Sequence, residues 1–381
     1  MSQRPPELDL LLRCCSRAAD PRHDRLSDLS GRMDPNKFLN LAAWHQVRPL
    51  LSHRLFELSP DCLSETLRSE LRAFARANAA NSLHLSSELL RLVDELQRIG
   101  ITAIPFKGPV LAERLHGNAA LREFVDLDLF VPSAEIQSAR TALVDLGYAS
   151  EMPLRAANDP AFFKSECEYI LRGANDLIVE LHWSVAPRML AYDVDWNGIW
   201  KRITSTQFCG RSVPAFHDSD LMLLLLLHGA KHGWSRLKWL CDVAWFVEEG
   251  EIDYEFLLGE AEERGYSRAL LIGLDLAAQM FAVRLPDTIS DRCKADRSVG
   301  NTNARLVERM MQAEPLSDAA LLRFRTMSRE RQADKLRVLG RTIFAPNQAD
   351  YGNSRMRRPL GAIHYFARPL RLLRKRLASA N

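Results

Sequence analysis

The sequence predicts an α+β fold in which a strand-containing core lies between an N-terminal helical region and a helical C-terminal domain. Three patterns support this. Apolar residues recur at helical spacing over 1–95, apolar-alternating runs interleave with helical segments over 96–215, and the 3.6-residue period returns over 216–345. A basic tail, 346–381, completes the four predicted regions.

The composition is that of a globular protein and leaves its partners open. The 381 residues are enough for two or three domains, and 47% of them are hydrophobic. The 51 basic and 48 acidic residues give a net charge of +3, which is too near balance to indicate nucleic acid as a partner.

The cysteine and hydropathy patterns favour a reducing, cytoplasmic location. The seven cysteines are scattered and include no C-x-x-C pair, which argues against a disulfide framework and a zinc ribbon. The N-terminal segment lacks the long apolar region of a signal peptide. The longest apolar run, Leu221–Leu227, is far shorter than the roughly 20 residues of a membrane span, so we expect a buried helix there and no transmembrane segment.

The N-terminal region is predicted to be helical and to serve packing or substrate contact, since it shows no cluster of titratable residues. Leu67, Leu71 and Phe74 recur at spacings of four and three in a helical pattern that ends at Gly100, a residue suited to a helix C-terminus. The following run, 101–106, is rich in β-branched residues and predicts a short strand.

Strand and helix patterns alternate in the core. In chain order they are a turn at Lys107-Gly108, a helix over 109–116, a strand over 124–131 and a helix over 133–146. Ser133 is expected to cap the second helix and Gly147 to close it. Two alternating runs, 167–171 and 177–185, are joined by turn residues and predict a hairpin.

Helical patterns resume after Asp218 and continue to about residue 345. The tail beyond Asp350 holds eight basic residues and no acidic one. Its apolar residues favour a terminal helix packed on the body, with docking on RNA or an anionic membrane as the alternatives.

Asp126 and Asp128 form the most informative local pattern in the chain. Alternate strand residues share a face, so the two carboxylates are expected to project together while Val125, Leu127 and Leu129 pack into the core. Two adjacent carboxylates repel each other unless a cation lies between them. Their hard oxygen atoms predict a divalent metal site, with Mg²⁺ as the expected ion.

Glu180 is the expected third carboxylate of this site. It lies in the strand-like run 177–185, which a sheet can bring beside the aspartate strand. Three such groups can hold two Mg²⁺ ions, one orienting a triphosphate and one activating an attacking hydroxyl.

In order and spacing, these residues resemble the DNA polymerase β-like nucleotidyltransferase superfamily, and within it the uncharacterised nucleotidyltransferases. The resemblance covers roughly 85–250 and rests on Phe106-Lys107-Gly108, Arg122, Asp126-Leu127-Asp128, Glu180-Leu181-His182-Trp183, the segment from His228 to His232, and Trp239-Leu240-Cys241-Asp242. It implies a polymerase β-like core with a mixed sheet.

The resemblance also implies a function and a set of roles. The function is Mg²⁺-dependent transfer of a nucleoside monophosphate from an NTP, with ATP expected, to an acceptor that the sequence does not identify. Asp126, Asp128 and Glu180 would bind metal and carry catalysis. The implied nucleotide-binding residues are Lys107, Gly108, Arg122, His182 and His232, and orienting a carboxylate is the alternative role for His182. Lys107-Gly108-Pro109 departs from the Gly-Ser pair of the wider superfamily and lacks its hydroxyl.

Two other functions stay open at this point. The chain can be a non-catalytic nucleotide-binding or scaffold protein on the same fold, or a phosphotransferase that uses the same metals. The acceptor can be a protein or peptide, a small molecule or RNA. His228 and His232 have the spacing of zinc ligands, but Gly229 replaces the glutamate that a zinc protease needs. Trp234, Trp239 and Trp245 are expected in the core.

Overall fold

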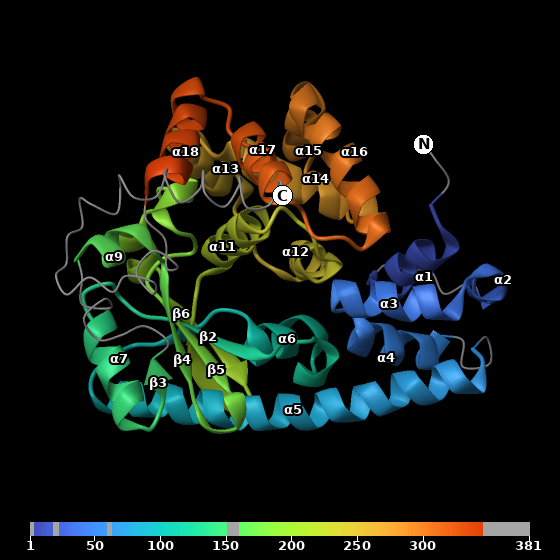
Figure 1. The fold of residues 1–381 in the computed structure, drawn as a ribbon, viewed down its shortest axis with the longest axis horizontal. Coiled ribbons are helices and arrows are strands. Elements are labelled where there is room, and N and C mark those ends of the chain that lie inside the picture. Colours follow the sequence, from blue (N-terminus) through green and yellow to red (C-terminus); the bar gives the residue numbers. More distant parts are fainter. Residues whose placement is uncertain (1–3, 18–22, 59–62, 151–159, 346–381) are drawn as a thin grey trace, which may run out of the picture.

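A five-stranded mixed sheet lies among helices that come from both ends of the chain (Figure 1). The computed structural model describes all residues except 1–3, 18–22, 59–62, 151–159 and 346–381. The predicted α+β fold with a mixed sheet is confirmed. The predicted basic tail, 346–381, lies outside the described residues.

The strands of the main sheet run in the order β1-β2-β5-β4-β3. They are β1 (Ile104–Pro105), β2 (Asp126–Phe130), β3 (Ala149–Ser150), β4 (Glu168–Arg172) and β5 (Ile178–His182). β2 and β5 are parallel, and the other neighbouring pairs are antiparallel. The predicted hairpin is confirmed as β4 and β5, joined through the 3₁₀ turn Ala174–Asp176. A separate two-stranded sheet pairs β6 (Thr204–Phe208) with β7 (Arg211–Ala215).

Helices precede the sheet, flank it and follow it. The N-terminal ones are α1 (Pro6–Cys15), α2 (His23–Arg32), α3 (Pro35–His45), α4 (Arg48–Leu58) and α5 (Glu65–Arg98). Those within the sheet region are α6 (Gly108–His116), α7 (Ile136–Asp145), α9 (Pro160–Ser165) and α10 (Trp196–Lys201). The C-terminal ones are α11 (Asp218–Lys231), α12 (Leu237–Glu249), α13 (Tyr254–Arg264), α14 (Ser267–Phe281), α15 (Asp287–Ala295), α16 (Arg297–Gln312), α17 (Asp318–Met327) and α18 (Gln332–Phe344).

The long helix α5 ties the two hydrophobic clusters of the described residues together. It has 34 residues and runs along the N-terminal helices and the sheet in Figure 1. Leu67 and Leu71 belong to the cluster that joins the N-terminal and C-terminal helices. Leu85 and Leu89 belong to the cluster formed with the sheet. α5 therefore positions the sheet relative to the N-terminal helices.

The predicted buried helix over the apolar run is confirmed as part of α11. All seven residues of Leu221–Leu227 are buried, because α14 packs against one side of α11 and α12 against another. Within the described ranges, every helix is too short or too polar to span a bilayer. The described cysteines are free thiols.

Two local expectations about the core elements are wrong. Pairing in β2 starts at Asp126, so Val125 lies ahead of the strand and is 66% exposed instead of packed in the core. Ser133 does not cap α7, because a turn in which Glu135 N–H donates to the Pro132 carbonyl delays the helix until Ile136. The closing role of Gly147 is confirmed, since its φ of 95° needs glycine.

His45 links α3 to the C-terminal helices through a buried imidazole. Its Nε2 lies 3.0 Å from the Met310 carbonyl, and the Leu237 backbone N–H donates to its Nδ1 over 3.2 Å. The ring therefore holds one proton, on Nε2. Burial lowers the pKa of His45 from 6.5 to about 4.

This burial predicts a loss of stability in acid. The unfolded chain binds a proton at His45 below about pH 6.5, whereas the folded chain does so only below about 4, so the unfolded state binds more protons between them. His45 should thus remove about 3 kcal/mol of unfolding free energy as the pH falls from 7 to 4. Urea denaturation at several pH values should show that the unfolding free energy of His45→Gln depends less steeply on pH than that of the wild type. His84→Gln, at an exposed position on α5, should keep the wild-type slope.

Candidate active site

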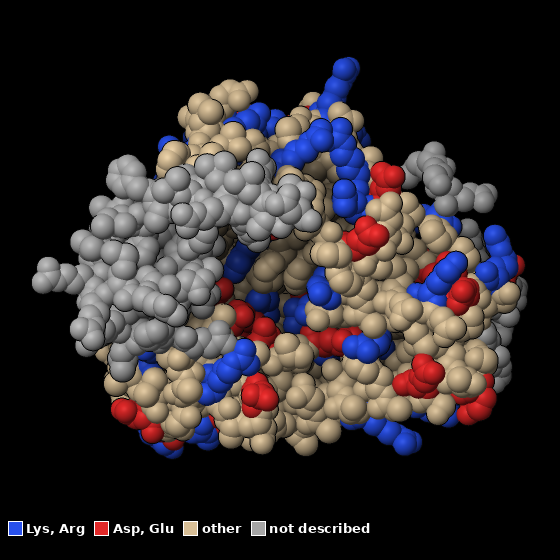
Figure 2. Space-filling view, viewed as in Figure 1, with Lys and Arg blue, Asp and Glu red and all other residues tan. Residues whose placement is uncertain are grey.

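A cavity of about 520 Å³ lies where the sheet, α5, α11 and α12 meet. Figure 2 shows a hollow in this face of the molecule, with basic and acidic side chains gathered around it. The residues that line it include Gln46, Arg48, Phe74, Asn78, Asn81, Lys107, Arg122, Glu123, Val125, Asp126, Asp128, Glu168, Glu180, His228, Lys231, His232, Lys238 and Trp239. Small-molecule sites commonly measure about 300–1,000 Å³.

The parallel pairing of β2 and β5 brings the three predicted carboxylates to this cavity. Asp128 lies directly opposite Glu180 in the register, and Asp126 lies two residues earlier on the same strand. Asp128, Glu180 and His182 offer ligand atoms within 4.8 Å of one another, the spacing of a metal site. Asp126 lines the same cavity but is not part of that group. The close cluster thus includes His182, which was not predicted as a metal ligand.

The surroundings compensate the negative charge of Asp128 but not that of Asp126. Burial and the charges of Asp128 and Glu180 raise the pKa of Asp126, and Lys107 offsets this only in part. Burial alone would raise the pKa of Asp128, but the Lys107 ammonium and a hydrogen bond from His182 outweigh it and hold that pKa below its usual range. A divalent cation bound by these oxygen atoms would relieve the remaining repulsion.

His182 lies beneath the carboxylates and connects them to a buried ion pair. Its Nε2 is 3.0 Å from Asp128 Oδ1 and 3.2 Å from Glu180 Oε2, and its Nδ1 is 3.2 Å from Glu168 Oε2. Lys231 Nζ holds the same Glu168 oxygen at 3.2 Å. Burial would lower the pKa of His182, but its hydrogen bonds to these acidic groups raise it well above its usual value.

This position favours one of the two roles expected for His182. The side chain is 4% exposed and does not line the cavity. Its contacts with Asp128 and Glu180 suit the residue that orients a carboxylate. Glu168 places a negative charge beside the other ring nitrogen, Nδ1.

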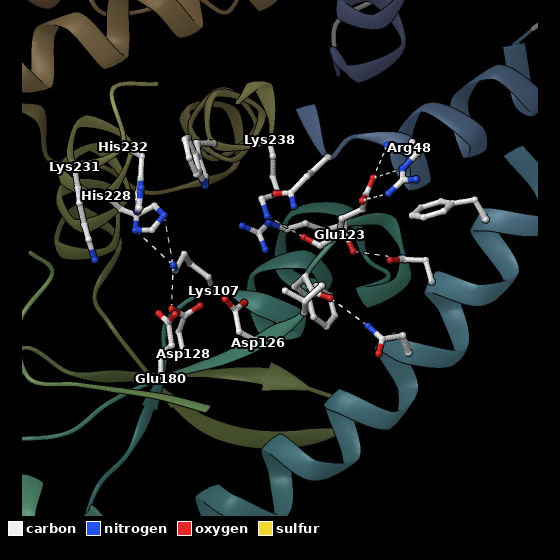
Figure 3. Close-up of a pocket in the computed structure, with 18 of the residues that line it drawn as sticks. Arg48, Lys107, Glu123, Asp126, Asp128, Glu180, His228, Lys231, His232 and Lys238 are labelled. Carbon is white, nitrogen blue, oxygen red and sulfur yellow. Dashed lines mark hydrogen bonds and ion pairs between the residues drawn. The ribbon is translucent and has the colours of Figure 1, made fainter. Parts of the chain in front are cut away.

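Lys107 and Gly108 form the turn between β1 and α6. Lys107 Nζ is 3.0 Å from Asp128 Oδ1 and 3.5 Å from both ring nitrogens of His228, as Figure 3 shows. Gly108 starts α6 with φ +59°, a conformation that disfavours side chains, while the space beside it is open apart from the Asp126 carbonyl oxygen at 3.8 Å. The turn therefore needs its glycine for conformation and directs Lys107 to the carboxylates.

Arg122 lines the cavity, but its guanidinium is bound to another side chain of the protein, that of Asp242. Its Nε and Nη2 donate to the two carboxylate oxygens of Asp242 over 2.8 and 2.9 Å, and both side chains are almost fully buried. This bidentate geometry is the one that a guanidinium also uses to bind a phosphate. The pair joins the segment before β2 to α12.

His228 and His232 both face the cavity, with ring centres 4.7 Å apart. Burial and nearby lysine charges lower the pKa of His228 well below its usual value and that of His232 to about 3, so both rings are neutral. His232 stacks on Trp239 at 4.9 Å. Trp239, which was expected in the core, packs against it half-buried and also lines the cavity, and Trp234 and Trp245 are buried.

Several lining residues were missed because the sequence gives no local signal for them. Lys238 is the second residue of α12, and its Nζ donates to the Glu123 carbonyl over 3.2 Å. It forms no ion pair with the described acidic groups, and burial together with the Arg122 charge lowers the pKa of Lys238 to about 7. A half-buried lysine with so little compensation favours an anionic ligand.

The N-terminal helices supply the far wall of the cavity. Arg48 holds Glu123 through two side-chain bonds of 3.1 and 2.8 Å, and its guanidinium lies 3.5 Å from the Phe74 ring centre. Asn78 and Asn81 of α5 donate to backbone carbonyls of the segment that leads into β2. The spacing of Phe74, Asn78 and Asn81 places them on one face of α5.

The Arg122–Asp242 pair predicts a large stability effect. Asp242→Ala should lower the unfolding free energy by about 3–5 kcal/mol, because it leaves a buried guanidinium without its partner. Arg122→Met/Asp242→Leu should recover most of that loss, since neither buried charge remains. Urea denaturation of Arg122→Met, Asp242→Leu and the double variant measures the coupling. An unchanged stability in Asp242→Ala would contradict a structural role for the pair.

A family model described as uncharacterised nucleotidyltransferase matches residues 31–282. No curated protein matches the chain. The matched segment contains the three carboxylates as well as Arg48 and Lys238, so it includes both walls of the cavity.

Proposed function

Since the chain belongs to the family of uncharacterised nucleotidyltransferases, we propose that it transfers a nucleoside monophosphate from an NTP to an acceptor and releases pyrophosphate. ATP is the proposed donor and Mg²⁺ the proposed metal. The observation that carries this proposal is the register of β2 and β5, which sets Asp128 beside Glu180 at the floor of a ligand-sized cavity.

Asp126, Asp128 and Glu180 are the proposed metal ligands. They fit the ion because carboxylate oxygens are the donors that Mg²⁺ prefers, and because the raised pKa of Asp126 reports uncompensated negative charge in a buried place. When bound, Mg²⁺ would neutralise charge on the triphosphate and lower the barrier to in-line displacement at phosphorus. His182 would keep Asp128 and Glu180 in place.

The phosphates are proposed to lie near the start of α6. Gly108 allows the backbone to turn there, and free N–H groups at a helix start attract anions. Lys107 and Lys238 would supply positive charge from two sides, with Arg122 behind them. His232 and Trp239 form a flat wall against which the nucleoside can pack.

The proposed reaction needs only one proton to move. The acceptor hydroxyl oxygen bonds to the α-phosphorus, and the bond between that phosphorus and the oxygen bridging to the β-phosphate breaks. Glu180 would take the hydroxyl proton, and pyrophosphate would carry away the bonding electron pair as its charge.

Transfer of labelled phosphate tests the proposal. With cell extract as the acceptor source and Mg²⁺ present, label from α-³²P-ATP should appear on an acceptor and label from γ-³²P-ATP should not. Asp128→Asn and Glu180→Gln should each lower transfer at least about 100-fold, since a lost metal ligand removes several kcal/mol of transition-state stabilisation. Asp291→Asn, whose side chain is 74% exposed, is the matched control and should transfer normally.

Other outcomes would point to the alternative functions. Label that moves only from the γ position would show phosphotransfer. No transfer from either position, with calorimetric ATP binding that ignores both Mg²⁺ and the Asp128 substitution, would favour a scaffold protein.

Lys238 gives a second test. Lys238→Ala should weaken binding of a non-hydrolysable ATP analogue about tenfold or more, because a charge-assisted hydrogen bond to phosphate is lost. Lys294→Ala, at a side chain 77% exposed, is the control and should bind as the wild type does. Calorimetry measures both, and equal affinities would remove Lys238 from the phosphate site.

A further inference from the structure

The Lys107 ammonium lies beside Asp128, at a position that a bound metal ion would also occupy. Its ammonium is 3.0 Å from Asp128 Oδ1, the oxygen that His182 also contacts at 3.0 Å. Asp128 is 4% exposed, so few directions remain from which a metal ion can reach it. A positive ammonium and a divalent cation cannot share that approach without strong repulsion.

The surroundings of Lys107 allow its ammonium to move to a second position, at the start of α6. The residue stands immediately before α6, so its stem starts at the helix end where phosphates are proposed to lie. Its contacts with the His228 nitrogens are long, at 3.5 Å, and that imidazole is neutral and holds the ammonium only weakly. The four-carbon stem of a lysine reorients easily.

We propose that Lys107 is an exchangeable counter-ion, which a divalent cation displaces from Asp128 and which then binds the nucleotide phosphates. This inference rests on the proposed function. It makes Lys107 a positioning residue that couples two events: metal binding frees the ammonium for phosphate, and phosphate draws the ammonium away from the metal site. Binding of each ligand should strengthen binding of the other by the same factor.

Manganese affinity without nucleotide tests the exchange directly. Mn²⁺ is the probe, and the free ion is counted by electron paramagnetic resonance in titrations of the full-length chain. Lys107→Met should bind Mn²⁺ about tenfold or more tightly than the wild type, because the competing charge is gone. Lys107→Gln should do the same, and circular dichroism verifies that each variant folds.

Lys294→Met is the control, since it removes the same charge from a side chain that is 77% exposed and does not line the cavity. Its Mn²⁺ affinity should change by no more than about twofold. A non-hydrolysable ATP analogue should raise the Mn²⁺ affinity of the wild type. The factor by which it raises the affinity should be several-fold smaller in Lys107→Met.

The outcomes separate the inference from the function on which it rests. Equal or weaker Mn²⁺ binding by both Lys107 variants, with clear binding by the wild type, overturns the exchange alone. An equal gain of affinity in Lys294→Met overturns it too, because the effect would then be one of general charge. Failure of every variant to bind Mn²⁺, with or without the analogue, overturns the metal-dependent function together with the exchange.

Discussion

The parallel pairing of β2 with β5 is the constraint on which the rest of the site depends. Residues far apart in the chain face each other only in this register, and a shift by one residue would turn Glu180 to the opposite face. The same register puts His182 under both carboxylates, because it follows Glu180 by two residues on the same side of the strand. The antiparallel neighbour β4 then presents Glu168 to the imidazole.

Charge alternates outward from these strands. Asp128 is contacted by Lys107 and His182, His182 by Glu168, and Glu168 by Lys231. Each charge in this series therefore has a neighbour of opposite sign, and removing one would leave the next without its partner. The pKa of Asp126 is raised, so its carboxylate would be stabilised by a cationic ligand. The pKa of Lys238 is lowered, so its ammonium would be stabilised by an anionic ligand.

The parts that sequence patterns predicted well are those set by alternation within one strand. Asp126, Asp128 and Glu180 reach one cavity because residues two apart share a face. Val125 and Ser133 were misplaced because a strand or helix begins where pairing or turn geometry allows, which one residue does not decide. Contacts such as that of Arg122 with Asp242 join segments 120 residues apart, and no local sequence pattern predicts them.

The continuity of α5 restricts how the chain can vary in length. One face of this helix supplies Phe74, Asn78 and Asn81 to the cavity, and a later stretch packs on the sheet through Leu85 and Leu89. Inserting one residue between them would rotate everything beyond it by about 100° and advance it by about 1.5 Å. Homologous chains should therefore keep this interval free of insertions and deletions, and gain or lose residues in the surface turns instead.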